Sequence, residues 1–286
     1  MSAITVGARR RSSLLGILRF GLLQARIELV NRFTSWSALG NLVVPIVLVL
    51  IYSVVDIRGT IGVDSVRTIV AGSAVALLFV NSFVGIAGEL VTEQDDGTML
   101  RVRMLPNGLS AHLIGKVVSL LVTSLLTLLL ILIPTQLLVG PVLPTTLPGW
   151  LGLLGVALLA LVATVPLGAA AGSLLKSPVA VFPVSLIAYA LVIVSGTFFP
   201  LDVLPAWLGG IVRVFPVYWL GELSRAVLLP EQTALGLVQT AFAIGVPLLW
   251  AILGLLLVPR ALNTMTRRQS GSRLDEIRRR REVRGY

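Results

Sequence analysis

Long apolar stretches follow one another along the chain between residues 38 and 258, each bounded by charged residues or by Pro and Gly. About 20 consecutive apolar residues carry an α-helix across the ~30 Å hydrocarbon core of a bilayer. Because a charged side chain at the bilayer centre costs about 2.5–3.5 kcal/mol, such a helix excludes Lys, Arg, Asp and Glu. Six stretches fit this description, and they predict an all-α polytopic membrane protein with six transmembrane helices at residues 38–55, 68–88, 117–139, 151–174, 179–199 and 235–258.

The composition and the charge agree with a membrane protein. Of the 286 residues 56% are hydrophobic, which is more than a soluble domain of this size needs for its core. The net charge of +10 is gathered at the two ends of the chain, where arginines precede the first predicted span and follow the last. Because Lys and Arg close to spans stay on the cytoplasmic side, both termini are expected in the cytoplasm. The charge therefore gives no reason to expect nucleic acid as a partner.

Two terminal segments flank the six-span domain predicted at residues 38–258. Residues 1–37 form a cytoplasmic N-terminus, in which residues 14–36 lack Pro and are rich in apolar residues, so we expect a connecting helix in the membrane interface. A plain leader into the first span is the alternative. Residues 259–286 form a basic cytoplasmic tail with too few apolar residues to fold alone. Its arginines are attracted to anionic membrane lipids by about 1 kcal/mol each.

A connection on the predicted cytoplasmic side, residues 89–116, contains a short helix near residues 98–105. An Asp-Asp-Gly-Thr break precedes this helix, and a Pro-Asn-Gly sequence at 106–108 ends it. The helix is unusually apolar for an element that faces water, and its two methionines can adapt to an irregular groove. Either a partner protein covers it or it packs beneath the membrane.

The segment at residues 200–232 is too long for a turn and too apolar for a solvated loop. Apolar residues recur at helical spacing before and after Pro216, which predicts a re-entrant hairpin of two short helices that dips into the outer leaflet. Arg213, Glu222 and Arg225 are strong charges within it, and they form a candidate outer gate in which they pair with one another. Ordinary interfacial charges are the alternative.

The sequence lacks the residues of several other activities. It has no G-x-x-x-x-G-K-[ST] phosphate loop and no cysteine, and His112 is its only histidine. We therefore expect no catalytic, cofactor-binding or metal site in this chain, and a structural or exposed role for His112. The predicted spans contain neutral polar residues such as Asn81 and Tyr189 but no Asp, Glu, His, Lys or Arg. This disfavours an ion-coupled secondary transporter, which stays as the alternative from another class.

Two motifs resemble those of the transmembrane (permease) subunit of type 2 ATP-binding-cassette (ABC) exporters, in particular the multidrug and antibiotic exporters. The first motif runs from Glu93 through Gly97, Thr98 and Pro106 to Lys116 and is similar to the cytoplasmic loop of that family. The second, residues 196–228, is similar to its outer re-entrant segment. The resemblance implies that the short cytoplasmic helix is a coupling helix seated on a separate ATPase, through Glu93, Gly97, Thr98, Met99, Leu100, Arg101, Arg103, Met104 and Pro106.

The same resemblance implies the partners and the class of cargo. Two copies of an ABC ATPase subunit would bind ATP and Mg, and a second permease copy, identical or a sibling, would complete the transporter in the bacterial cytoplasmic membrane. The spans show no aromatic ladder of the kind that suits a sugar channel, so a lipophilic or amphipathic drug, antibiotic or lipid is favoured over a polysaccharide or glycolipid. The candidate translocation path comprises Asn81, Phe83, Tyr189 and Phe199.

Overall fold

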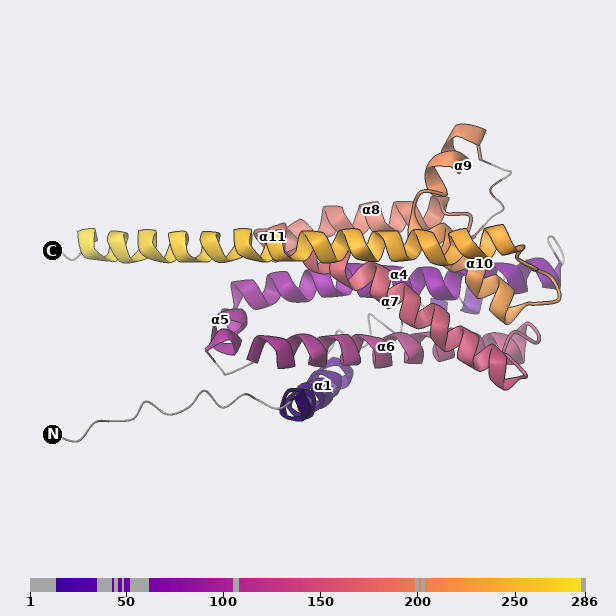
Figure 1. The fold of residues 1–286 in the computed structure, drawn as a ribbon, viewed down its shortest axis with the longest axis horizontal. Coiled ribbons are helices and arrows are strands. Elements are labelled where there is room, and N and C mark those ends of the chain that lie inside the picture. Colours follow the sequence, from indigo (N-terminus) through magenta and orange to yellow (C-terminus); the bar gives the residue numbers. More distant parts are fainter. Residues whose placement is uncertain are drawn as a thin grey trace.

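The computed structural model describes residues 14–34, 43, 46–47, 49–51, 62–104, 108–198, 201 and 204–283. The long helices run side by side, and α1 lies across their direction against α6 (Figure 1). Within the described ranges the regular elements are all helical. They are α1 (Leu14–Thr34), α4 (Val63–Asp95), α5 (Thr98–Arg103), α6 (Gly108–Leu138), α7 (Leu147–Leu174), the 3-10 helix η1 (Pro178–Ala180), α8 (Val181–Val194), α9 (Ala206–Val212), α10 (Pro216–Leu228) and α11 (Leu237–Val283).

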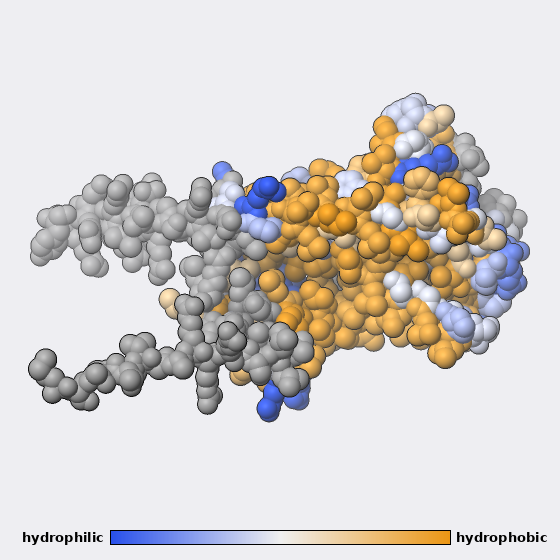
Figure 2. Space-filling view, in the orientation of Figure 1, coloured by the Kyte–Doolittle hydropathy of each residue, from blue (hydrophilic) through white to orange (hydrophobic). Residues whose placement is uncertain are grey.

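Four helices of the described residues are long and apolar enough to cross a membrane: Val63–Asp95, Ala111–Leu138, Leu147–Leu174 and Leu237–Ala261. They coincide with the second, third, fourth and sixth predicted spans. The fifth predicted span is a shorter apolar helix, Pro178–Val194. Most of the first predicted span, residues 38–55, lies outside the described residues. Figure 2 shows hydrophobic side chains over the middle of the bundle and hydrophilic ones toward its ends, as expected for a membrane-embedded bundle.

The helix α8 ends early for a local reason. Gly196 adopts a left-handed backbone conformation with φ 73°, which glycine tolerates and which commonly follows the last turn of a helix. The hydroxyl of Ser195 donates to the backbone oxygen of Val192 at 2.7 Å and satisfies one of the free carbonyls of that turn. The chain then forms the two short helices α9 and α10, and α10 begins at Pro216, where the sequence predicts a break.

The helix α4 occupies the centre of the bundle and packs on α6, α7, α8 and α10. Small residues let α7 approach it closely, and a Cβ added at Gly168 would lie 2.4 Å from the backbone oxygen of Phe83. Gly172, one turn further along α7, is nearly as close to α4. Glycines at this spacing allow close helix packing in membranes. A 2.7 Å hydrogen bond between the hydroxyls of Ser82 and Thr164 also joins the two helices.

Replacing Gly168 by Ala is expected to lower thermal stability, because the added methyl group forces α4 and α7 apart and overpacking of a core costs about 1–3 kcal/mol. The matched control is Gly155→Ala on the same helix, where an added Cβ would meet no atom within 4 Å. Thermal unfolding of the purified protein, followed by circular dichroism, measures both variants. Equal midpoints for the two variants would contradict the close packing at Gly168.

The basic tail is helical. The helix α11 runs from Leu237 to Val283, so the tail is a helical extension of the last span and not an unfolded segment. Extending a helix that has already formed avoids the cost of nucleation. Arg, the most frequent residue after residue 260, is also a good helix former. The sequence predicts that the tail cannot fold alone. In the structure it continues a helix that the last span has already formed.

The helix α1 packs on α6 through small residues and leaves large apolar side chains uncovered. A Cβ at Gly21 would lie 2.7 Å from the side chain of Ile114, and Ala25 is buried. Phe20 and Ile27 are exposed. The helix thus exposes apolar side chains, while its polar residues Gln24, Glu28 and Arg32 turn toward α4 and α6.

Candidate functional site

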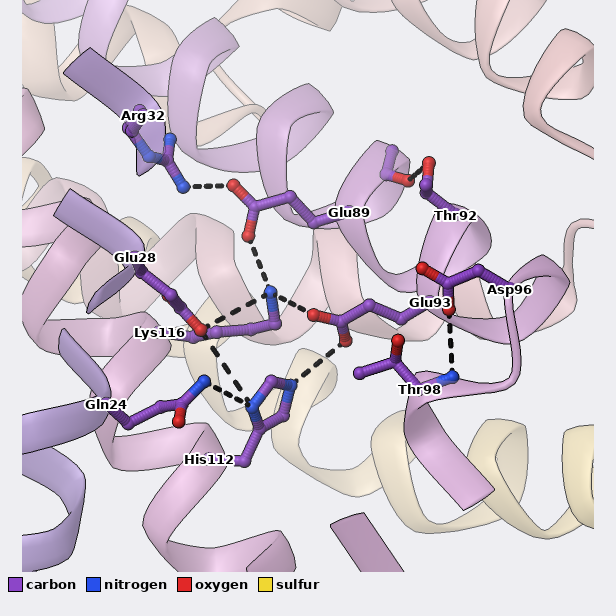
Figure 3. Close-up of polar contacts among 11 residues, drawn as sticks. Gln24, Glu28, Arg32, Glu89, Thr92, Glu93, Asp96, Thr98, His112 and Lys116 are labelled. Carbon is purple, nitrogen blue, oxygen red and sulfur yellow. Dashed lines mark hydrogen bonds and ion pairs between the residues drawn. The ribbon is translucent and has the colours of Figure 1, made fainter. Parts of the chain in front are cut away.

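Ionisable side chains gather where α1, α4 and α6 meet, near α5 (Figure 3). Each of the three helices supplies two such residues four positions apart, and residues at that spacing share one face of a helix. The charged faces of the three helices therefore turn toward one another. We call this group the three-helix cluster. It comprises Glu28 and Arg32 of α1, Glu89 and Glu93 of α4, and His112 and Lys116 of α6.

Lys116 is the centre of the three-helix cluster. Its Nζ lies 2.7 Å from Glu93, 2.8 Å from Glu89 and 3.9 Å from Glu28. Only 3% of the side chain is exposed. An ammonium group loses its hydration on burial, and only close, well-placed partners compensate for that loss. Three carboxylates from two other helices do so here, so Lys116 ties α6 to both α1 and α4.

His112 and Arg32 extend the cluster on either side of Lys116. The Nε2 atom of His112 lies 3.0 Å from a carboxylate oxygen of Glu93, and its Nδ1 lies 3.5 Å from the side-chain amide of Gln24. Arg32 donates a hydrogen bond to Glu89. His112 is buried, so of its two predicted roles the structural one holds.

Glu28 is the least satisfied member of the cluster. Both its carboxylate oxygens are buried without a hydrogen-bond partner, and this burial raises the pKa of Glu28, against the opposing effect of the Lys116 charge. Ligand atoms of Glu28, Glu93 and His112 lie within 4.8 Å of one another, a spacing that three metal ligands can have. Lys116 already supplies the positive charge at this place, so a metal ion would have to displace it.

A tight turn joins α5 to α4. Gly97 has a φ of 73°, a conformation that favours glycine. The carboxylate of Asp96 accepts a hydrogen bond from the Thr98 backbone N–H at 2.8 Å, and the hydrogen bonds with Thr98 lower the pKa of Asp96. The exposed Arg101 donates to the backbone oxygen of Asp96 at 3.1 Å. Gly97, Thr98 and Arg101 thus fix the direction in which α5 leaves the bundle.

The predicted contact face of α5 needs a correction. Met99 is not on the surface, because only 1% of it is exposed and it packs in the core with Leu90 and Leu120. A helix of six residues against a bundle must turn one face inward, and Met99 lies on that face. Glu93 is likewise turned into the three-helix cluster, while Met104 is 85% exposed. Outside the described part of the chain lie Pro106 and the side chains of Leu100 and Arg103.

The candidate outer gate lies at the opposite end of the bundle from α5. Arg225 donates to Glu222 at 2.7 Å, so the predicted pairing of these two residues is confirmed. Glu222 and Arg225 line a cavity of about 810 Å³, and Arg213 lines it as well. Only 7% of Arg225 is exposed, because its guanidinium lies over Gly72 of α4, where an added Cβ would be 2.5 Å away. Arg225 is therefore a buried link between α10 and α4 and not an ordinary interfacial charge.

The residues of the candidate translocation path fall into different places. Asn81 and Tyr189 line one hollow of about 190 Å³, together with Arg32 of the three-helix cluster. Phe83 stacks on Phe79, with ring centroids 5.9 Å apart, and lines a different pocket. Phe199 lies outside the described residues. The structure thus brings two of the four candidates together.

Sequence reasoning missed the three-helix cluster, although a signal for it existed. Paired ionisable residues four positions apart occur beside the second and third predicted spans and in the N-terminal helix. Such pairs are also typical of a solvated helix face. Only the packing of α1 on α6 distinguishes an ion-pair cluster between helices from such a face.

The fold and the site define a class of protein: a polytopic helical membrane protein, one end of which carries a short helix beside a cluster of ion pairs that joins three other helices. The family model described as ABC-2 family transporter protein matches residues 61–258, more than half of the chain. The chain belongs to this family, as the two motifs indicate, and it is the membrane domain of an ABC transporter that works with an ABC ATPase. A comparison with curated proteins finds no match.

Proposed function

We propose that this permease subunit exports a lipophilic or amphipathic compound across the bacterial cytoplasmic membrane, powered by a separate ATPase subunit. The observation that carries the proposal is the construction of α5. Its inner residue Met99 is locked in the core, whereas Met104 is 85% exposed and has no role in the packing of the described residues. A methionine left exposed on a helix that the core holds in place is suited to a partner surface, because its flexible side chain adapts to an irregular groove.

The proposed assembly contains two permease copies and two ATPase subunits, which bind ATP and Mg. Each permease copy has six spans, both termini in the cytoplasm, and a re-entrant hairpin formed by α9 and α10. The orientation of α1 across the long helices (Figure 1) supports its place in the membrane interface, and so does the exposure of its apolar side chains.

The three-helix cluster supports a mechanism of coupling. A push on α5 reaches α4 through the turn at Gly97 and reaches the core through Met99. From α4 it passes to α6 and α1 through the ion pairs of Glu89 and Glu93 with Lys116, and of Glu89 with Arg32. Closure of the ATPases would thereby move these helices together, as a switch between two discrete packings.

An ion-coupled transporter remains the second candidate, because one observation favours it. The buried His112 and the part-buried Glu93 lie at the ends of α6 and α4, which are long enough to span a membrane, with Glu28 of α1 beside them, so the three groups could exchange protons. Against it, the pairing with Lys116 holds these carboxylates in an ion-pair network that already has a structural role.

Transport in inside-out vesicles distinguishes the two candidates. In vesicles that contain this chain and its ATPase partner, uptake of a lipophilic fluorescent compound should require hydrolysable ATP and persist when a protonophore is added. A control with a non-hydrolysable ATP analogue should show no uptake. Uptake by the chain alone, driven by a pH gradient without ATP, would contradict the proposal and establish ion coupling.

A further inference from the structure

A pocket of about 470 Å³ opens on the side of the bundle, away from the three-helix cluster and the outer gate. We call it the side pocket. Its walls come from α4, α7, α8, α11 and the start of α10. Small side chains leave the space, namely Ala170 and Ala171 on α7 and Ala188 on α8. Binding pockets for small ligands measure about 300–1,000 Å³, so the side pocket is large enough for one.

The side pocket is long and apolar. One end is closed by Phe215 and Trp250, whose rings stack with centroids 5.5 Å apart. The indole N–H of Trp250 donates to the backbone oxygen of Val214 at 2.8 Å, which fixes the ring in place. From Trp250 the lining extends along α11 to Thr264, a distance of about 21 Å at 1.5 Å per residue. A cavity with such walls does not hold water well, so its occupant should be an apolar chain.

Arg260 is the charged residue in this lining, and no acidic residue of the described part of the chain lines the pocket with it. One N–H group of Arg260 donates to the backbone oxygen of Leu256 at 3.3 Å. A guanidinium carries five N–H donors, so donors remain for an anion at the mouth of the pocket. Arginine binds phosphate especially well, because two parallel N–H groups match two oxygens.

We propose that the side pocket binds an anionic phospholipid of the surrounding membrane, with an acyl chain between α8 and α11 and the phosphate on Arg260. Charge complementarity selects this occupant, because a single cation stands at one end of a largely apolar pocket, and three of the helices that line it are long enough to cross a membrane. Basic pockets between transmembrane helices bind anionic lipid head groups on the same principle. The site is separate from the α5 surface on which the proposed function rests.

Fluorescence quenching tests the site, because Trp250 lines the pocket. The chain has five tryptophans, so the Trp250 signal is the difference between the wild type and Trp250→Phe. The purified protein is placed in nanodiscs of phosphatidylcholine that contain a rising fraction of phosphatidylglycerol with brominated acyl chains. Quenching of the Trp250 signal should saturate at a low fraction of this lipid, whereas brominated phosphatidylcholine should require about tenfold more, as expected for one charge-assisted contact.

Three variants separate the parts of the proposal. Arg260→Gln should weaken the preference for phosphatidylglycerol about tenfold, and Arg26→Gln, at an exposed arginine of α1, should leave it unchanged. Ala171→Phe should fill the pocket and abolish the quenching of Trp250 by either lipid, while circular dichroism confirms its fold. Equal quenching by the two brominated lipids, unaffected by Arg260→Gln, would overturn the proposal, as would unchanged quenching in a folded Ala171→Phe variant.

Discussion

Replacing Lys116 by Met should destabilise the protein by about 3–5 kcal/mol, because removing one partner of a buried ion pair leaves uncompensated charge. Lys116 pairs with both Glu89 and Glu93, at 2.8 and 2.7 Å, and only 3% of its side chain is exposed. Without it, the carboxylates of Glu28, Glu89 and Glu93 would repel one another across the α1–α4–α6 junction.

The two lysines of the chain make a matched pair for this experiment. Lys176→Met removes the same charge at an exposed position, so its midpoint of thermal unfolding should stay close to that of the wild type. Adding Glu93→Gln to Lys116→Met should recover part of the loss, because one buried charge is then removed. Equal midpoints for Lys116→Met and Lys176→Met would show that the three-helix cluster does not hold the helices together.

Replacing Met104 by Asp should abolish coupling without unfolding the permease. Met104 is 85% exposed, so its own chain tolerates the change, but an unpaired charge buried against a partner costs several kcal/mol. The ATPase should then co-purify poorly with the permease, and ATP-dependent uptake should fall by at least about tenfold.

Two further variants serve as controls for Met104→Asp. Met104→Leu keeps an apolar side chain and should retain the ATPase, whereas Met99→Asp should lower the thermal stability of the permease itself, because Met99 lies in the core. Full retention of the ATPase and of transport by a folded Met104→Asp variant would show that α5 is not the coupling element.

The long helices could be predicted from the sequence because the bilayer imposes one strong condition, an uncharged apolar stretch of sufficient length. Features that depend on local conditions, such as where a helix ends, are harder to predict. Gly196 shortens the fifth helix, and the helical state of the tail depends on its attachment to α11 and not on its own composition. Each of these features requires knowledge of the neighbouring residues in space or along the helix.

The site was harder to predict than the fold, because its residues come from three separated segments. The motif around Glu93 indicates a coupling loop, but the motif does not state which side chains face a partner and which face the core. Met99 and Glu93 turn inward because α6 supplies the side chains they contact, Leu120 for Met99 and His112 and Lys116 for Glu93. Arg225 is buried for a similar reason, since Gly72 on another helix makes room for its guanidinium.

The length of α11 makes it suitable for measuring changes in helix tilt. A helix of 47 residues measures about 70 Å, and the part beyond Ala261 projects about 33 Å past the last candidate span. Because the chain has no cysteine, a single spin label at residue 270 would be attached to a rod that is continuous with the transmembrane bundle. In a complex of two copies, the distance between the two labels would report any change in helix tilt with strong amplification, and could be followed through a transport cycle without labelling the cargo.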